Sequence, residues 1–356
     1  MSATRVSGRL TSLRAAVTIG PRALDIVERP EPPPPAEGST LLRMETVGIC
    51  GSDLHFFTNE LGPTHEKLFP RVQGHEFSAV VEAVDPAGSP FEIGDRVAVW
   101  PVSGCGRCRS CTAGRPNVCS EIDLIGVHHD GALQDLVLVD TANVVAADDL
   151  SPAQTALVEP VSIAIHTVVR AGVRAGEQIV VFGAGPIGFA TAIAARERGG
   201  RVTLIDPVVS RRELVNRAGF EAGAPDPASL GALGGVAGPH TVIDTTGRPD
   251  VLQTALDLAG NGGRVVVVGL TGASAPVCSG TLPFKELDVL GVSCCVADEF
   301  AAAVALVRGH RGLFDTFVSH TFPLDRVNDA FELLEHDPET AYKALIDLRP
   351  ETGATP

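Results

Sequence analysis

Four cysteines lie close together in one glycine-containing stretch of the sequence. Their spacing is Cys105-x-x-Cys108-x-x-Cys111 followed after seven residues by Cys119. Four thiolates can complete a tetrahedral zinc site, and a chain of 356 residues does not need disulfides to stabilise its core. Two alternatives are an iron–sulfur run for the first three cysteines, from which the fourth departs in spacing, and four free thiols grouped by coincidence. We expect a structural zinc loop at residues 104–120.

Three short segments carry the residue types of a second, catalytic metal site. Together they offer a thiol, a hydroxyl, imidazoles and carboxylates, from Cys50, Ser52, Asp53, His55, His75, Glu76 and Glu159. A catalytic zinc needs such ligands together with one open coordination position. Each segment alone also has an ordinary interpretation, such as a hydrogen-bonded structural histidine or a capping glutamate. Spacing does not bring the segments together, so the residues alone leave their role open.

A glycine-rich turn follows a β-branched run. The sequence Gln178–Phe182 is typical of a buried strand, and the Ala-rich stretch 189–198 is typical of a helix. In that context the G-x-G-x-x-G pattern between them indicates a dinucleotide site. The first glycine allows a tight turn, the second lets the backbone approach a pyrophosphate, and the third allows close packing. The predicted binding residues are Gly183, Gly185, Pro186, Ile187 and Gly188.

Asp206 stands at the end of the next predicted strand. It lies close to the offset of about 20 residues at which a carboxylate takes the ribose hydroxyls of NAD. A turn or helix-capping aspartate is the alternative interpretation. Arg211 and Arg212 complicate the choice, because a nearby arginine can accommodate the extra phosphate of NADP. We expect NAD rather than NADP, with Asp206 and Arg211 among the cofactor-binding residues.

The elements that must position these residues change in character near residue 151. Before it, short β-rich runs alternate with turn clusters, and little helical period is present. After it, apolar runs alternate with helix-length segments, which predicts a doubly wound parallel sheet. We therefore predict an α/β protein with a mainly β domain at 1–158 and a Rossmann domain at 159–299. A C-terminal segment, 300–356, is expected to return to the first domain.

Composition limits the partners of the chain. Lys and Arg number 28 against 43 Asp and Glu, and the net charge of -15 disfavours nucleic acid. No apolar run reaches the ~18 residues of a membrane span, and the N-terminus lacks the apolar core of a secretory signal. We expect a cytoplasmic protein without membrane attachment. An organelle-targeting peptide in the acid-free leader Met1 to Arg14 is the alternative.

The combination of motifs resembles the zinc-containing medium-chain dehydrogenase/reductase family, more closely its polyol (sorbitol-type) and threonine dehydrogenase branch. The likeness runs from Leu13–Val17 through GICGSDLH, GHEF, the four-cysteine loop, LVEP and GAGPIG to Phe322–Phe331. It implies a GroES-like β domain and a Rossmann domain. A glutamate at 159, where classical alcohol dehydrogenases carry cysteine, favours the polyol branch.

The resemblance also implies roles for individual residues. Cys50, His75 and Glu159 match the catalytic zinc ligands, so that the chain would hold two zinc ions, one catalytic and one structural. Glu76 matches an acid beside the metal, and Asp53 one that orients the ligand histidine. Ser52 and His55 match a proton relay. The implied reaction moves a hydride from a secondary alcohol to NAD, with zinc as Lewis acid.

The expected substrate is a small-molecule alcohol, namely a polyol or a related polyhydroxylated compound. Sugar acids (aldonates), L-threonine, aminocyclitols and small diols are alternatives, because pocket shape decides among them. A non-catalytic dinucleotide-binding zinc protein is the alternative from another class. Relatives form dimers or tetramers, so we expect a homo-oligomer, either a homotetramer or a dimer. Residues 287–295 are the candidate pairing edge.

Overall fold

The computed structural model describes residues 12–60, 69–234 and 237–350. Most of the arginine-containing leader, residues 1–11, therefore lies outside the described residues. The chain divides into two compact units. Unit 1 comprises Met1–Glu159, Val307–Asp337 and Lys343–Pro356, and unit 2 comprises Pro160–Leu306 and Pro338–Tyr342.

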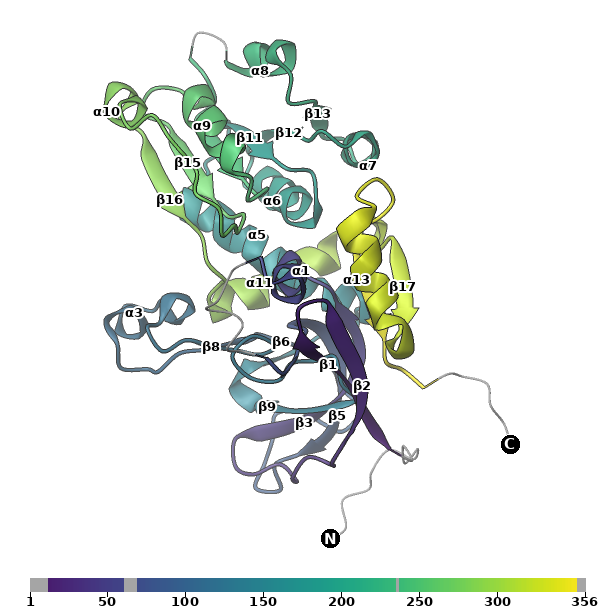
Figure 1. Ribbon diagram of the computed structural model, residues 1–356. Helices are drawn as coiled ribbons and strands as arrows, with labels where there is room; N and C mark the ends of the chain where they lie inside the picture. The colour runs from purple at the N-terminus through teal and green to yellow at the C-terminus, as the bar shows by residue number, and fades with distance from the viewer. Residues whose placement is uncertain (1–11, 61–68, 235–236, 351–356) are drawn as a thin grey trace. The chain divides into compact units, whose positions relative to one another are not determined.

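Unit 1 is built on β-sheets whose strands pair mostly antiparallel (Figure 1). A three-stranded sheet has the order β2-β1-β4, and a larger one has the order β10-β6-β5-β3-β18-β17, with β9 also paired to β3. The strands are β1 (Leu13–Gly20), β2 (Ala23–Arg29), β3 (Ser39–Gly48), β4 (Arg71–Val72), β5 (Glu76–Val84), β6 (Arg96–Val99), β9 (Leu136–Asp140), β10 (Val144–Ala146), β17 (His320–Pro323) and β18 (Ala344–Asp347).

Strand β3 is the centre of the larger sheet. Its side chains at Leu42, Met44 and Val47 are buried, as expected for a strand with neighbours on both edges. Strand β18 pairs with β3 at Ile346↔Val47, so the C-terminal segment completes this sheet. This pairing holds the start of β18 beside the end of β3. The candidate-site residues follow β3 directly in the chain.

The helices of unit 1 are short. They are α1 (Gly51–Thr58), α3 (Arg109–Thr112), α4 (Pro152–Ala156), α12 (Arg311–Phe314) and α13 (Val327–His336), with 3-10 turns η1 (Pro116–Val118), η2 (Thr141–Asn143), η3 (Asp315–Phe317) and η4 (Leu324–Arg326). Strands β7 (Val102–Ser103) and β8 (Asp123–Leu124) form a separate ladder beside α3 (Figure 1).

Helix α1 was not predicted from the sequence, which showed little helical period in this region. Its eight residues are too few for a visible period, and tertiary contacts stabilise it. The Asp53 carboxylate accepts the Cys50 N–H at 3.0 Å at its start, and Asn59 ends it in the left-handed region at φ 59°. Phe57 packs into the core against Phe331 of α13, with ring centroids 4.7 Å apart.

Unit 2 contains a six-stranded parallel sheet with the order β13-β12-β11-β14-β15-β16 (Figure 1). Its strands are β11 (Gln178–Phe182), β12 (Arg201–Ile205), β13 (Glu221–Gly223), β14 (Thr241–Asp244), β15 (Arg264–Val267) and β16 (Asp288–Gly291). Counted from β11 this is the order 3-2-1-4-5-6, which defines the Rossmann fold. The predicted doubly wound α/β sheet is confirmed.

Helices flank this sheet and connect its strands. They are α5 (Val158–Ala171), which begins in unit 1 at Val158, then α6 (Pro186–Glu197), α7 (Val209–Arg217), α8 (Pro227–Gly234), α9 (Pro249–Leu258), α10 (Thr281–Lys285) and α11 (Ala297–Gly309). Helices α6 and α9 begin with proline, whose fixed φ suits the first helical position. Among the residues that the structure describes, no helix has the length and apolar character to cross a bilayer.

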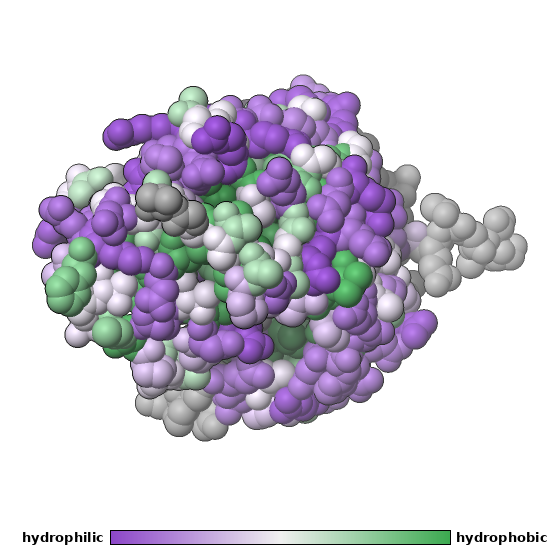
Figure 2. Space-filling view, turned by 90° about the horizontal axis from the view of Figure 1, so that it is seen from above, coloured by the Kyte–Doolittle hydropathy of each residue, from purple (hydrophilic) through white to green (hydrophobic). Residues whose placement is uncertain are grey.

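The surface shown in Figure 2 is mostly hydrophilic, with hydrophobic side chains scattered over it. Such a distribution is ordinary for a protein face in contact with water.

Candidate active site and metal centres

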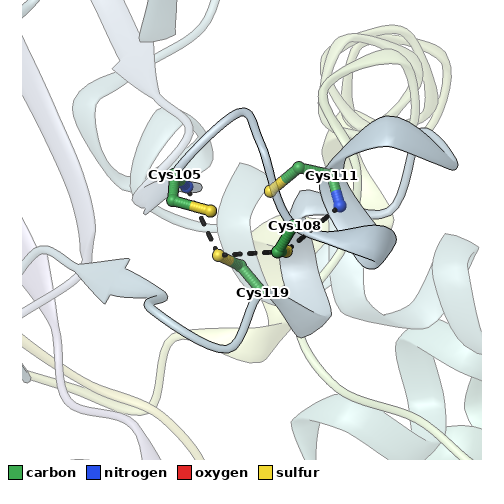
Figure 3. A group of neighbouring side chains, drawn as sticks. All are labelled: Cys105, Cys108, Cys111 and Cys119. Atoms are coloured by element: carbon green, nitrogen blue, oxygen red, sulfur yellow. Dashed lines mark hydrogen bonds between the residues drawn. The ribbon is translucent and has the colours of Figure 1, made fainter.

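The four cysteines of the predicted zinc loop converge. Their sulfur atoms lie within 4.8 Å of one another and point toward a common centre (Figure 3). The Cys119 Sγ accepts the Cys105 N–H at 3.3 Å, and the Cys108 Sγ accepts the Cys111 N–H at 3.5 Å. Backbone donors lower the pKa of the Cys108 thiol to about 5. All four thiols are free, and their arrangement fits a tetrahedral zinc ion.

A second group of possible metal ligands lies where β3, α1 and β5 meet. Cys50 stands between β3 and α1, while His75 and Glu76 stand at the start of β5. One ligand atom from each of these three residues lies within 4.8 Å of the other two. The His75 Nε2 faces α1, 3.4 Å from the Ser52 Oγ. Segments separated in the sequence are thus brought to one point by the sheet.

One buried polar atom of this group indicates that a cation fits here. The Glu76 Oε1 is buried and has no hydrogen-bond partner within the described part of the chain, whereas the His75 Nδ1, which also has none, faces the Asp53 carboxylate at 3.7 Å. Buried polar groups without partners are uncommon in native proteins, and a bound ion is one explanation for such a group. A thiol, an imidazole and a carboxylate are donors that zinc accepts together.

Asp53 lies beneath His75 and is 3% exposed. Its Oδ1 is 3.7 Å from the His75 Nδ1, and its Oδ2 accepts the Cys50 N–H. Burial raises the pKa of Asp53, against the opposing effect of His75. Burial also lowers the pKa of His75, but the Asp53 carboxylate and the Cys50 thiol more than offset this and hold that pKa well above its ordinary value.

Glu159 enters from the first turn of α5 and is 7% exposed. Burial raises the pKa of its carboxyl to about 7, although the positive charges of His75 and Lys343 act in the opposite direction. The carboxyl therefore lies within the electrostatic field of the cluster. Among the described residues, however, the group within 4.8 Å consists of Cys50, His75 and Glu76, and Glu159 is outside it.

Lys343 is a site residue that the sequence did not reveal. Its side chain is 5% exposed, its Nζ forms an ion pair with the Glu76 Oε2, and it donates to the Ile49 carbonyl at 2.9 Å. A Cβ on Gly48 would lie 2.5 Å from the same Glu76 oxygen, so a side chain there would disturb the pair. The only signal in the sequence is a lysine directly before an apolar strand, in a chain with few lysines.

The proposed proton-relay residues both lie on α1. Ser52 and His55 are three residues apart, which places them on neighbouring positions of one helix face. The His55 Nδ1 lies 2.8 Å from the Glu60 Oε2, and its side chain is 29% exposed. His55 is therefore in contact with solvent and with an anion, whereas Ser52 faces His75.

In unit 2 the glycine-rich turn connects β11 to α6 where the strand order reverses. Gly183 has φ 96°, and a Cβ on Gly188 would lie 1.9 Å from the Gly183 carbonyl, so both positions need glycine. A Cβ on Gly185 would meet nothing nearer than the Arg211 Nη1 at 3.7 Å. The space over Gly185 is thus open to a ligand, and the N-terminus of α6 beside it suits a phosphate. Pro186 and Ile187 form the first turn of α6.

Asp206 braces this turn. Its Oδ2 accepts the Ala184 N–H at 2.7 Å and its Oδ1 accepts the Val208 N–H at 2.8 Å. The Tyr342 hydroxyl, which sequence reasoning also missed, donates to the Ala184 carbonyl at 2.9 Å. Asp206 therefore acts as a turn aspartate, while each oxygen keeps a lone pair for a further donor. The Arg211 Nε is buried without a hydrogen-bond partner in the described chain.

Comparison with known proteins matches both halves of the chain. Residues 36–149 match the family model described as alcohol dehydrogenase GroES-like domain, and residues 186–309 match the one described as zinc-binding dehydrogenase. The L-galactonate-5-dehydrogenase of Escherichia coli (strain K12) is 33% identical over 308 residues, which cover 85% of this chain and 89% of that relative. The 2-dehydro-3-deoxy-L-galactonate 5-dehydrogenase of Pseudoalteromonas atlantica is 32% identical over 344 residues, covering 95% and 99%.

Solved structures agree. The NADH complex of an alcohol dehydrogenase from Escherichia coli CFT073 has a TM-score of 0.85 at 28% identity, covering 95% of this chain and 100% of that one. The NADP complex of a zinc-binding dehydrogenase from Sinorhizobium meliloti has a TM-score of 0.84 at 28% identity, with coverage of 95% and 100%.

The fold and the two ligand groups define a zinc-dependent oxidoreductase that acts on CH–OH groups. The chain belongs to the zinc-containing medium-chain dehydrogenase/reductase family, the alcohol dehydrogenase superfamily. The predicted family, fold class and enzyme class are confirmed.

Proposed function

We propose that the chain oxidises a secondary alcohol of a polyhydroxylated compound to a ketone and transfers the hydride to NAD. The observation that carries this proposal is the grouping of Cys50, His75 and Glu76, in which the buried Glu76 Oε1 has no hydrogen-bond partner among the described residues. That grouping supplies the donors of a catalytic metal centre in a family whose members act on alcohols.

In this proposal Cys50 and His75 would hold the catalytic zinc together with Glu159, whose buried carboxyl lies outside the group within 4.8 Å but within its electrostatic field. Cys105, Cys108, Cys111 and Cys119 would hold the structural zinc. A zinc ion at the catalytic site supplies Lewis acidity, which favours loss of the alcohol proton near neutral pH. Asp53 orients the His75 ring through its Nδ1. Glu76 lies close enough to contact the metal and is balanced by Lys343.

Ser52 and His55 handle the proton. The Ser52 hydroxyl would accept the proton of the substrate hydroxyl while releasing its own proton toward His55, and His55 would pass a proton to solvent, which its partial exposure supports. The Glu60 carboxylate holds the ring of His55 by its Nδ1, leaving the Nε2 to receive the proton.

Gly183, Gly185, Pro186, Ile187 and Gly188 form the coenzyme turn, with Asp206 and Arg211 beside it. The remaining lone pairs of Asp206 favour the ribose hydroxyls of NAD, since an additional phosphate would meet a carboxylate. Arg211 provides a positive charge near Gly185 that suits the pyrophosphate. NADP is the second choice, because a related protein binds it.

A sugar acid is the first substrate to test, because two relatives are named for oxidation of galactonate derivatives. A cytoplasmic location belongs to the proposal, because the four-cysteine site requires reduced thiols. We also infer that the chain forms a homo-oligomer through β16, which lies at the edge of its sheet.

The test is a screen for formation of reduced nicotinamide with NAD and with NADP. Each coenzyme is paired with polyols, aldonates, L-threonine, aminocyclitols and small diols. We expect turnover of an aldonate or polyol with NAD, and loss of at least ~100-fold of kcat/KM in Glu159→Gln together with loss of one bound zinc. Glu82→Gln removes another buried glutamate of unit 1, paired with Arg43, and should retain both zinc and activity. Unchanged turnover in Glu159→Gln would remove that residue from the mechanism.

A further inference from the structure

A chain of buried polar side chains leads away from His75 into the core of unit 1. The Thr18 hydroxyl on β1 lies 2.5 Å from the Gln73 Oε1, and the Gln73 Nε2 donates to the Asp53 carbonyl at 2.9 Å. The same amide nitrogen is 3.3 Å from the Asp53 Oδ1. Thr18, Gln73 and Asp53 are 0%, 1% and 3% exposed, so water does not compete for these contacts.

The chemistry of Asp53 fixes the direction of every hydrogen bond in this chain. An ionised carboxylate and a carbonyl only accept, so the Gln73 NH2 group must face Asp53 and its carbonyl oxygen must face Thr18. The Thr18 hydroxyl is then the donor. A glutamine amide held at both ends has one orientation, and it spans from the main chain to the side chain of Asp53. Together with the Cys50 and Gly74 N–H groups, which donate to the same carboxylate at 3.0 and 3.4 Å, the Gln73 amide restricts the rotamer of Asp53.

The backbone around Gln73 is held equally firmly. The Gln73 and Gly74 carbonyls accept the Leu133 and Ala132 N–H groups at 3.0 and 2.9 Å. Gly74 has φ 98°, and a Cβ there would lie 2.8 Å from Val47. The backbone segment that precedes His75 therefore has little freedom to move. The side chain of Gln73 helps to position Asp53 relative to this segment.

We propose that Gln73, held by Thr18, is a positioning residue of the catalytic metal centre: its amide fixes the carboxylate of Asp53 that orients the His75 ring. The inference rests on the proposed role of His75 as a ligand. Neither Gln73 nor Thr18 contacts the cluster itself. They restrict the orientations of Asp53 and His75 in the metal-free protein. Because the site is then already arranged for the metal, their loss should lower the zinc affinity.

The experiment compares Gln73→Leu, Gln73→Glu, Thr18→Val and Thr18→Ser in the full-length protein. Zinc content is measured against a series of zinc buffers, and the visible spectrum of the cobalt-substituted protein reports the ligand geometry. Loss of an outer partner of a zinc ligand costs about 10- to 100-fold in affinity, and Gln73 acts one contact further out. We therefore expect the zinc ion of the catalytic site, called the second zinc, to bind about 3- to 10-fold more weakly in Gln73→Leu.

In Gln73→Glu the second zinc should bind more weakly still, because this variant places a like charge beside Asp53. Thr18→Ser keeps the hydroxyl and should match the parent, whereas Thr18→Val should not.

Gln154→Leu is the matched control. Gln154 is also buried in unit 1, and its amide donates to the Asp315 carboxylate at 2.8 Å. It should lower the melting temperature without changing zinc affinity. A Gln73→Leu protein that melts earlier but binds the second zinc as tightly as the parent would overturn the proposal. A parent that binds only one zinc would instead contradict the proposed catalytic site, so the two failures are distinguishable.

Discussion

At the scale of single residues, the most consequential contact is the ion pair between Lys343 and Glu76. Both side chains are at most 5% exposed, so each charge depends on the other. Removing one partner of a buried pair leaves an uncompensated charge, which typically destabilises a protein by about 3–5 kcal/mol. Lys343→Met should therefore lower the melting temperature of the metal-free protein strongly. Adding Glu76→Gln should restore most of the loss, because the unpaired carboxylate is then absent.

Lys343→Arg is the control for that prediction. It changes the shape of the side chain but keeps the positive charge that pairs with Glu76. Equal melting temperatures for the parent and Lys343→Met would show that the pair contributes nothing. Lys343 also illustrates what the sequence could not reveal. Its hydrogen-bond partner Ile49 lies 294 residues away in the chain, and no local pattern connects the two. Gln73 escaped notice for the same reason, because its partners lie on β1 and α1.

At the scale of elements, two glycines in the turn after β11 have different roles. One is needed for folding, and the other is needed for coenzyme binding. A Cβ on Gly188 would lie 1.9 Å from the Gly183 carbonyl, whereas a Cβ on Gly185 has open space. Gly188→Ala should destabilise unit 2 by more than ~2 kcal/mol, because the helix must move away from the strand. Gly185→Ala should melt like the parent and yet bind dinucleotide at least ~10-fold more weakly, because the methyl group occupies the space of the phosphates. Coenzyme titration and calorimetry of the two variants measure both effects; tight binding by Gly185→Ala would contradict the assigned position of the pyrophosphate.

Helices α5 and α11 are joined by His166 and Glu299, whose Nδ1 and Oε2 lie 2.8 Å apart. Burial raises the pKa of Glu299, but hydrogen bonds from His166 and the Val296 N–H outweigh it, so the net pKa is below the ordinary 4.5. A carboxyl with a lowered folded-state pKa contributes stability above its unfolded pKa, and that stability is lost as pH falls through the folded value. Glu299→Gln should thus be less stable than the parent at neutral pH, with the gap closing below about pH 4.5. Urea unfolding from pH 7 down to about pH 3 measures the gap. Glu213→Gln, on the exposed face of α7, should show none. A gap that stays constant with pH would exclude this linkage.

The elements also show how far the sequence alone could go. The strands of unit 2 were predictable because β11, β12, β14 and β15 are short, β-branched runs between helix-length segments. Strand β13 and helix α8 were missed, since both consist largely of Gly, Ala and polar residues and their order comes from tertiary contacts. The candidate site residues of unit 1 were recognisable from their chemistry, but only the resemblance to a family assigned them to one site. Their meeting point depends on the pairing of β3 with β5, which places Gly48 opposite Glu76.

At the scale of the whole molecule, strand β16 predicts self-association, because among the described residues its outer edge has no partner strand. Two exposed apolar side chains accompany this edge: Val289 on β16 is 45% exposed, and Phe284, four residues before the strand, is 90% exposed. A second copy pairing across a two-fold axis would satisfy the free backbone groups and cover these side chains. The double variant Phe284→Glu with Val289→Glu introduces two negative charges per chain, and a two-fold axis doubles these like charges within one interface. Burial of unpaired charge is costly, so the dimer should weaken by at least ~100-fold and the mass in solution should fall to that of single chains.

Val209→Lys, at a 52% exposed valine of α7 in the same unit, is the control and should leave the mass unchanged. A parent that is already a single chain in solution, or a double variant that keeps its mass, would rule out β16 as the oligomer interface.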